Sequence, residues 1–109
     1  MTYAAGHELK FAKISAADSG TNTIVAAVSG QKIKVCSYVI VAAGAVNAKW
    51  MSGASDLSGL LTLGTNSGVS CPAAGEAVLL ETVAGSALIL NLSGSVLVGG
   101  HLTYLTEEH

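Results

Sequence analysis

Apolar and polar residues alternate with a period of two along most of this chain, and Gly, Ser and Asn interrupt the alternation at short intervals. This pattern is typical of half-buried β-strands joined by turns. Eight strands are predicted, at residues 9–14, 22–28, 32–41, 46–51, 60–63, 77–82, 87–92 and 95–106, the last bent at Gly99-Gly100. In the clearest of them, 32–41, one face is predicted to carry Ile33, Val35, Ser37, Val39 and Val41, and the other Lys32, Lys34, Cys36, Tyr38 and Ile40.

Helical periodicity is poor, and a chain of 109 residues is expected to form one domain. Short strands with regular turn signals predict an all-β fold, an antiparallel β-sandwich or barrel. The predicted domain spans residues 8–106. An N-terminal arm or tail at 1–7 precedes it, and a C-terminal tail at 107–109 follows.

Two predicted strands are apolar on both faces, at Val39–Val41 and Leu88–Leu90. One face is expected in the core, and the other needs cover because monomers rarely expose a large apolar patch. Obligate interfaces resemble a domain core cut in half, so we expect self-association as a dimer or trimer. Trp50, the sole tryptophan, is expected in the core or at an interface, with a carbohydrate platform as the minority alternative. The candidate interface residues are Tyr38, Ile40, Trp50, Ile89 and Tyr104.

Composition narrows the classes of partner. Hydrophobic residues make up 50% of the chain and charged residues 11%, against about 25% charged residues in a typical soluble domain. The uncharged stretch 82–106 is long enough to cross a bilayer, but its Gly and Ser clusters predict turns, so no membrane partner is expected. Five lysines, no arginine and a net charge of −2 argue against nucleic acid. Neither a basic segment nor an apolar one begins the chain, so no signal peptide is expected.

Cysteine and histidine residues are few and poorly spaced for a metal. Cys36 and Cys71 are expected to be reduced thiols, with a disulfide as the minority alternative. His7, His101 and His109 lack zinc-ligand spacing, and His109 is open to being the remnant of a tag. We therefore predict no metal and no cofactor.

Catalytic constellations are equally weak. A triad drawn from His101 with Asp18 or Asp56 lacks the G-x-S-x-G frame of a nucleophilic serine. Glu76 and Glu81 are five residues apart and would lie on opposite faces of one strand, which does not suit glycoside hydrolysis. We predict that the protein is not an enzyme.

Several segments resemble a family of small virion structural proteins of tailed bacteriophages, over about residues 8–105. The resemblance rests on turn residues and hydrophobic pattern, and Cys71 beside Pro72 departs from it. The segments are LKFAKI (9–14), NTIVAAVSGQKIKV (22–35), VAAGAV (41–46), SG (52–53), DLSG (56–59), ETVAG (81–85), LILNLSGSV (88–96) and VGGHLTY (98–104).

This resemblance implies a jelly-roll-like sandwich of about eight strands and a homotrimer in the virion. We therefore predict a non-enzymatic capsid decoration (cement) protein, made in the host cytoplasm, that binds the major capsid protein on the outer capsid surface and stabilises the shell. The alternative is a head or tail fibre knob that binds a host receptor or glycan. Tyr3 and His7 are predicted capsid contacts of the N-terminal arm, unless that segment is a disordered tail.

Overall fold

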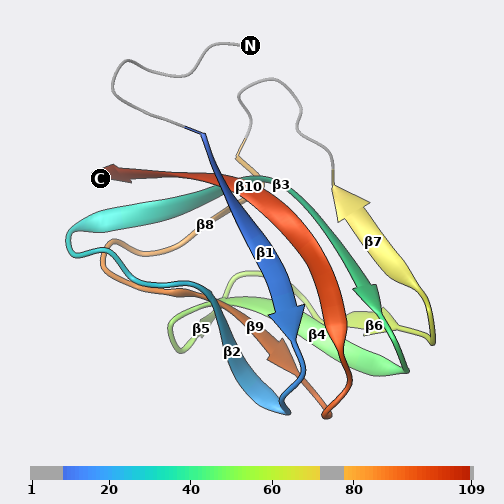
Figure 1. The fold of residues 1–109 in the computed structure, drawn as a ribbon. Coiled ribbons are helices and arrows are strands. Elements are labelled where there is room, and N and C mark those ends of the chain that lie inside the picture. The colour runs from blue at the N-terminus through green and yellow to red at the C-terminus, as the bar shows by residue number, and fades with distance from the viewer. Residues whose placement is uncertain (1–8, 72–77, 109) are drawn as a thin grey trace.

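The computed structural model describes residues 9–71 and 78–108, which form ten β-strands in two antiparallel sheets (Figure 1). Sheet A contains, in spatial order, β1 (Lys10–Ala16), β10 (Val98–Glu108), β3 (Gln31–Ala42) and β7 (Gly68–Cys71), and β8 (Leu80–Glu81) also pairs with β3. Sheet B contains β2 (Gly20–Val25), β9 (Leu88–Leu92), β4 (Val46–Ser52) and β5 (Ser55–Asp56), and β6 (Leu61–Leu63) also pairs with β4. Within those two ranges the chain forms no helix that could span a bilayer.

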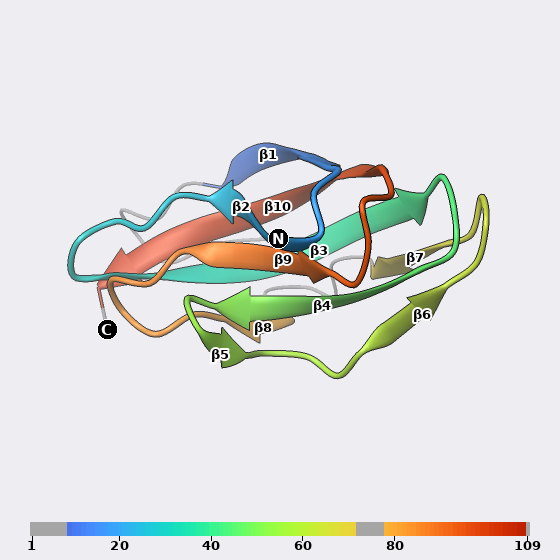
Figure 2. The ribbon, with the colours of Figure 1, turned by 90° about the horizontal axis from the view of Figure 1, so that it is seen from below.

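The strand order is that of a jelly roll. Leaving aside the two-residue strands β5 and β8, sheet A has the order β1-β10-β3-β7, and β2, β9, β4 and β6 follow one another in sheet B. The chain changes sheet at each connection between these eight strands except the one between β4 and β6. Figure 2 shows the two resulting layers, one behind the other. The predicted all-β, antiparallel, jelly-roll-like sandwich is therefore confirmed.

The core fills the space between the sheets. In β9, Leu88, Leu90 and Leu92 are buried, whereas the intervening Ile89 and Asn91 are half-buried on the other side of the strand. Such alternation is what a strand with one face on the core requires. The two inner faces bring together the following buried residues, among others: Ile14, Ile33, Val35, Ile40, Val98 and Leu102 from sheet A, and Val46, Trp50, Leu63, Leu88, Leu90 and Leu92 from sheet B.

A β-bulge in the pairing of β3 with β10 corrects the predicted faces of the segment 32–41. Ser37 pairs with Thr103, but the next residue of β10, Tyr104, pairs with Val35, so Cys36 is an extra residue in β3. An extra residue reverses the side to which every later side chain points. Ile33 and Val35 before the bulge, Cys36 at the bulge, and Ile40 and Ala42 after it are thus buried, while Val39 and Val41 face outward.

Strand boundaries differ from the predicted ones mainly at the edges of the sheets. β7 at Gly68–Cys71 was not predicted, and the strand predicted at 77–82 is reduced to Leu80–Glu81 in the described residues. Glu107 and Glu108, expected in a C-terminal tail, pair with Lys32 and Gln31 as the last residues of β10. Pairing with β3 therefore creates strand segments that the local sequence does not predict.

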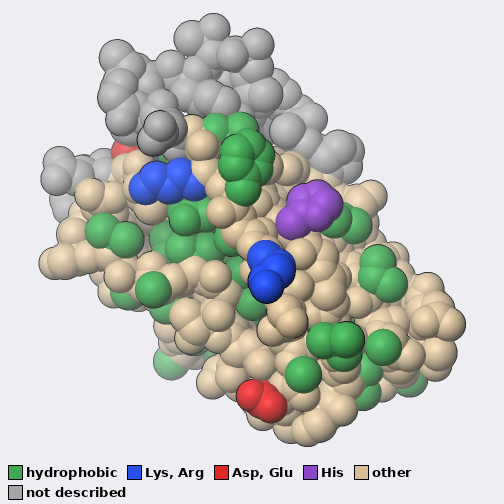
Figure 3. Space-filling view, in the orientation of Figure 1, with side chains coloured by type: hydrophobic (Ala, Val, Ile, Leu, Met, Phe, Trp, Pro, Cys, Tyr) green, Lys and Arg blue, Asp and Glu red, His purple; other side chains and the backbone are tan. Residues whose placement is uncertain are grey.

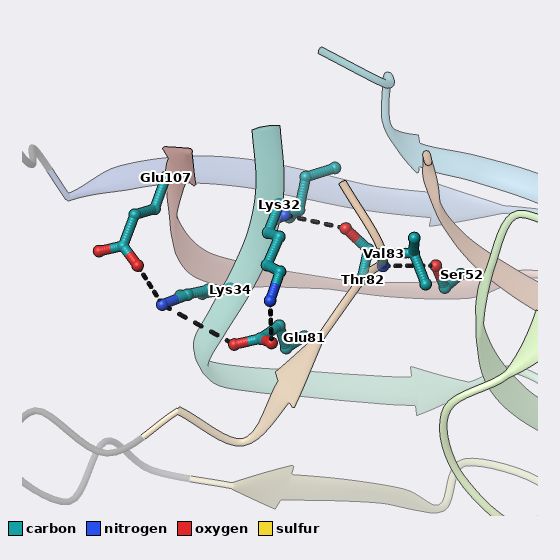
Figure 4. Close-up of polar contacts among 8 residues, drawn as sticks. Lys32, Lys34, Ser52, Glu81, Thr82, Val83 and Glu107 are labelled. Atoms are coloured by element: carbon teal, nitrogen blue, oxygen red, sulfur yellow. Dashed lines mark hydrogen bonds and ion pairs between the residues drawn. The ribbon is translucent and has the colours of Figure 1, made fainter. Parts of the chain in front are cut away.

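Two buried hydroxyl groups tie the segment after β8 to both sheets (Figure 4). The Ile33 N–H donates to Thr82 Oγ1 at 2.9 Å, and the Thr82 N–H donates to the Ile33 carbonyl, also at 2.9 Å. The Val83 N–H donates to Ser52 Oγ of β4 at 3.0 Å. Thr82 and Ser52 are the two buried polar residues among those described, and each satisfies a backbone donor that the sheet ladder leaves unpaired.

Replacing Thr82 with valine is expected to lower the free energy of unfolding by about 1–3 kcal/mol, because the buried Ile33 N–H loses its acceptor while shape is nearly kept. Chemical denaturation followed by far-UV circular dichroism measures the change. Thr23→Val, at an exposed position of β2, is the matched control and should stay within about 0.5 kcal/mol of the wild type. Equal stability of the two variants would contradict the assigned role of Thr82.

Candidate self-association surface

The structure places the five candidate interface residues mostly inside the sandwich. Ile40 and Trp50 are 0% exposed, so neither is available to a partner of the folded chain. Tyr38 and Tyr104 are half-buried and pack against the core. Ile89 is half-buried on the outer side of sheet B. Tyr38 and Ile40 were predicted to be available to a partner, but the bulge in β3 turns both side chains toward the core. Tyr3 and His7 lie outside the described residues.

Tyr38, Trp50 and Cys71 form a cluster between the sheets near the β7 edge. The Tyr38 and Trp50 rings meet edge to face, with centroids 5.2 Å apart and an interplanar angle of 64°. Burial, followed by the contact with the Cys71 thiol, raises the pKa of Tyr38 to about 12. Cys71 is half-buried and Cys36 is buried, and both are thiols. The cluster is packed rather than open, so it serves the core.

The outer face of sheet A carries small, polar and apolar side chains. Phe11 is 75% exposed and Val41 is 48% exposed, whereas Ser37 Oγ and Thr103 Oγ1 are hydrogen-bonded at 2.6 Å. Figure 3 shows the side on which β1 and β10 lie, where hydrophobic patches lie among largely uncharged surface. The face consists of three rows of cross-strand neighbours: Phe11, Thr103 and Ser37; then Lys13, His101, Val39 and Ser70; then Ser15, Gly99, Val41 and Gly68.

An apolar hollow of about 410 Å³ lies at one end of this face, and we call it the end hollow. Two backbone hydrogen bonds of 2.8 Å fix the loops around it, one from the Ala42 N–H to the Ser67 carbonyl and one from the Ala43 N–H to the Leu97 carbonyl. Its lining includes Val41, Ala43, Asn66, Leu97 and Gly99, which has no side chain.

Most described charges are paired with one another. Lys32 Nζ is 3.1 Å from Glu81 Oε2, and Lys34 Nζ contacts both Glu81, at 3.8 Å, and Glu107 (Figure 4). The hydrogen bond to Glu107 raises the pKa of Lys34 above its ordinary value, and partial burial opposes that rise. Lys49 pairs with Asp56 across sheet B at 3.1 Å. Each of these pairs is partly exposed and contributes little stability.

Three of the remaining charges lie along β1 and in the turn that follows it. Lys10 and Lys13 flank Phe11, and Asp18 follows the strand at the end nearest the end hollow. Neither Lys13 nor Asp18 makes an ion pair within the part of the chain that the structure describes. In the sequence, Phe11 and Lys13 are two residues apart and therefore on the same side of a strand. The charge of Lys13 was the one sequence feature that could have indicated that Phe11 faces outward. The hollow had no such signal, because it is formed by residues distant in sequence.

The residues weighed for catalysis are not brought together. His101 is exposed on sheet A, whereas Asp56 pairs with Lys49 on sheet B and Asp18 lies in the turn after β1. Glu81 is engaged by two lysines, and Glu76 lies outside the described residues. No group of three His, Cys, Asp or Glu side chains that could hold a metal ion occurs within residues 9–71 and 78–108.

No family model matches the chain, and no curated protein is similar to it in sequence. A solved structure of a Bacillus endospore appendage, from a novel family of disulfide-linked pili, is similar in fold. The similarity covers 94% of this chain and 88% of the appendage chain, with a TM-score of 0.55 and 15% sequence identity. At this level of identity the similarity establishes the fold.

This finding contradicts the expected virion role. The structural neighbour is a subunit of a bacterial pilus, so neither a capsid decoration protein on a phage head nor a fibre knob is supported. The predicted position on a capsid surface is wrong for the same reason. The phage resemblance rested on turn residues and hydrophobic alternation, and these features are common to sandwich folds of unrelated function.

Proposed function

We propose that this chain is a non-enzymatic structural subunit that assembles with copies of itself into a surface polymer. The observation that carries this is the exposed apolar side chains of a weakly charged domain. Eight large hydrophobic residues of the described part are exposed, among them Phe11 at 75% and Leu97 at 52%. Exposed apolar area rimmed by uncharged polar residues is typical of protein–protein contact sites. The pilus assembly of the structural neighbour supports a polymer, on a bacterial cell or spore, over a closed oligomer.

The sheet edges also favour contacts between copies. In the described residues β1 pairs with β10 alone and β2 pairs with β9 alone, so each is hydrogen-bonded on one side. An open strand edge is a template for another chain, unless charges or a covering segment protect it. Lys10 and Lys13 are the charges that β1 carries. The proposal does not require edge pairing, but the fold leaves it available.

We further propose that copies of this chain associate without disulfides, unlike the disulfide-linked pili of the structural neighbour. The chain has two cysteines, and Cys36 is only 1% exposed. Cys71 is thus the one thiol that another copy could reach. If each subunit forms one intermolecular disulfide, the bond joins two copies and no further copy can be added. A covalently linked polymer needs at least two such bonds per subunit. Non-covalent contacts must therefore extend the polymer.

Purified protein is expected to form filaments at micromolar concentration, visible by negative-stain electron microscopy and as rapidly sedimenting material. Because the contacts are non-covalent, dithiothreitol and the Cys71→Ser variant should leave filament length and yield unchanged. A monomer that persists across this concentration range would contradict the proposed function. Filaments that dissolve in reductant would contradict the non-covalent contacts alone.

A further inference from the structure

The most exposed large side chain of the described residues, Phe11, lies on the same sheet face as the end hollow. Phe11 pairs with Thr103 in the row nearest the start of β1. Gly99 and Val41, in the row of Ser15, line the hollow four residues further along the strand. At about 3.3 Å per residue the two features are roughly 13 Å apart along β1, too far for Phe11 to reach the hollow of its own chain.

The hollow suits an aromatic side chain in size and chemistry. An apolar cavity of about 150 Å³ can hold benzene, so a hollow of about 410 Å³ has room for a phenyl ring. Leu97, which lines it, is 52% exposed and would lose that exposure on contact. Hydrogen-bonded loops fix its walls, so an incoming ring would meet a preformed site.

The charges around the two features are complementary. Lys10 and Lys13 flank Phe11, whereas Asp18 follows β1 at the end where the hollow lies. A second copy whose hollow covers Phe11 can bring its Asp18 toward Lys13, which lies on the same face as Phe11. Opposite charges at facing positions favour the correct register of two surfaces.

The same charges disfavour a two-fold symmetric pairing. In a two-fold pairing, Phe11 of each copy would enter the hollow of the other. The row midway between Phe11 and the hollow would then face the same row of the second copy. Lys13 lies in that middle row, so the ammonium groups of the two copies would face one another. A head-to-tail contact avoids this opposition, and contacts of that kind continue into a filament instead of closing.

We propose that Phe11 of one copy inserts into the end hollow of the next copy, head to tail, with Lys13 facing Asp18 across the contact. This proposal rests on the proposed self-assembly and specifies one contact that extends the polymer. The partner is a second copy of this chain, and each subunit contributes its Phe11 side at one contact and its hollow at the next.

Two variants each remove one half of this contact. Phe11→Ser removes the exposed ring. Gly99→Leu fills the hollow, and the fold should accept it, because a Cβ at Gly99 meets no atom closer than the Ile14 carbonyl oxygen at 3.9 Å. Leu60→Ser, which removes another exposed apolar side chain next to β6 of sheet B, is the matched control. Circular dichroism and chemical denaturation establish that each variant folds.

Each single variant is expected to raise the concentration needed for assembly by about tenfold or more, as loss of a central anchor does, and Leu60→Ser should not. Mixing Phe11→Ser with Gly99→Leu should restore one intact contact and give one-to-one pairs that do not grow, measured by analytical ultracentrifugation. The charge exchange Lys13→Asp with Asp18→Lys should assemble better than either single change.

The outcomes separate this contact from the proposed function. If the wild type forms filaments and Phe11→Ser forms them equally well, the contact is wrong and the structural role stands. If both single variants fail to assemble but their mixture forms no pairs, the head-to-tail arrangement is wrong. If the wild type itself remains a monomer, the polymer and this contact are both overturned.

Discussion

Replacing Gly100 with alanine is expected to destabilise the domain by at least about 3 kcal/mol, and in a domain of this size that removes much of the net stability. A Cβ at this position would lie 1.9 Å from the Val39 carbonyl oxygen and 2.8 Å from its carbon. The clash is with backbone, which cannot rotate away as a side chain can. Gly100 also has φ of +155°, which residues with a side chain rarely adopt.

A movement of β10 cannot relieve this clash, because Gly100 lies in the middle of sheet A. It pairs with Ile14 of β1 on one side and Ile40 of β3 on the other, so moving β10 away from one strand drives it into the next. The denaturant midpoint, followed by circular dichroism, measures the loss. Gly94→Ala is the control, since a Cβ there meets no atom within 4 Å, and it should change stability by less than about 0.5 kcal/mol. A Gly100→Ala variant as stable as this control would show that the strands are not so closely spaced.

Replacing Trp50 with alanine is expected to cost about 3–5 kcal/mol, because it empties the largest buried site of the core. Trp50→Phe should cost much less. The smaller ring can still meet Tyr38 edge to face, and the indole Nε1–H that is lost has no hydrogen-bond acceptor among the described residues. Removing a buried donor that lacks a partner offsets part of the lost packing.

Circular dichroism is the required probe for these variants, since Trp50 is the sole tryptophan and its fluorescence disappears with it. Leu60→Ala, at an exposed position, controls for loss of apolar volume without a cavity and should remain close to the wild type. If Trp50→Phe were as damaging as Trp50→Ala, the indole nitrogen would have to hold an interaction that the packing described above does not include.

The period-two pattern predicted the fold class correctly because the core needs one buried face per strand. Leu88, Leu90 and Leu92 satisfy that requirement in the order in which they occur. Strands whose existence depends on a distant partner were not predictable in this way. β7 has little apolar alternation, and it forms because β3 offers hydrogen-bonding groups along Tyr38–Val41.

The predicted faces of the segment 32–41 were wrong because of one extra residue in β3. Counting alternate positions through 32–41 treats every residue as one step of the pleat, and the bulge at Cys36 adds a step that nothing in the local sequence signals. Tyr38 and Ile40 were consequently assigned to the wrong side. β1 pairs with β10 without a register shift, so simple alternation holds along it and places Phe11 on the outward side together with Lys13.

The central place of the last strand has a consequence for how the chain folds. β10 separates β1 from β3, so sheet A has no middle until residues 98–108 have been synthesised. Until then β1 has no neighbour among the described strands, and the pairings that define the domain join distant parts of the chain. Such pairings form slowly, because the chain loses the entropy of closing a large loop before the new contacts stabilise it. We expect the domain to fold only after β10 has been synthesised, with the unpaired edges of its strands exposed to other chains in the interval.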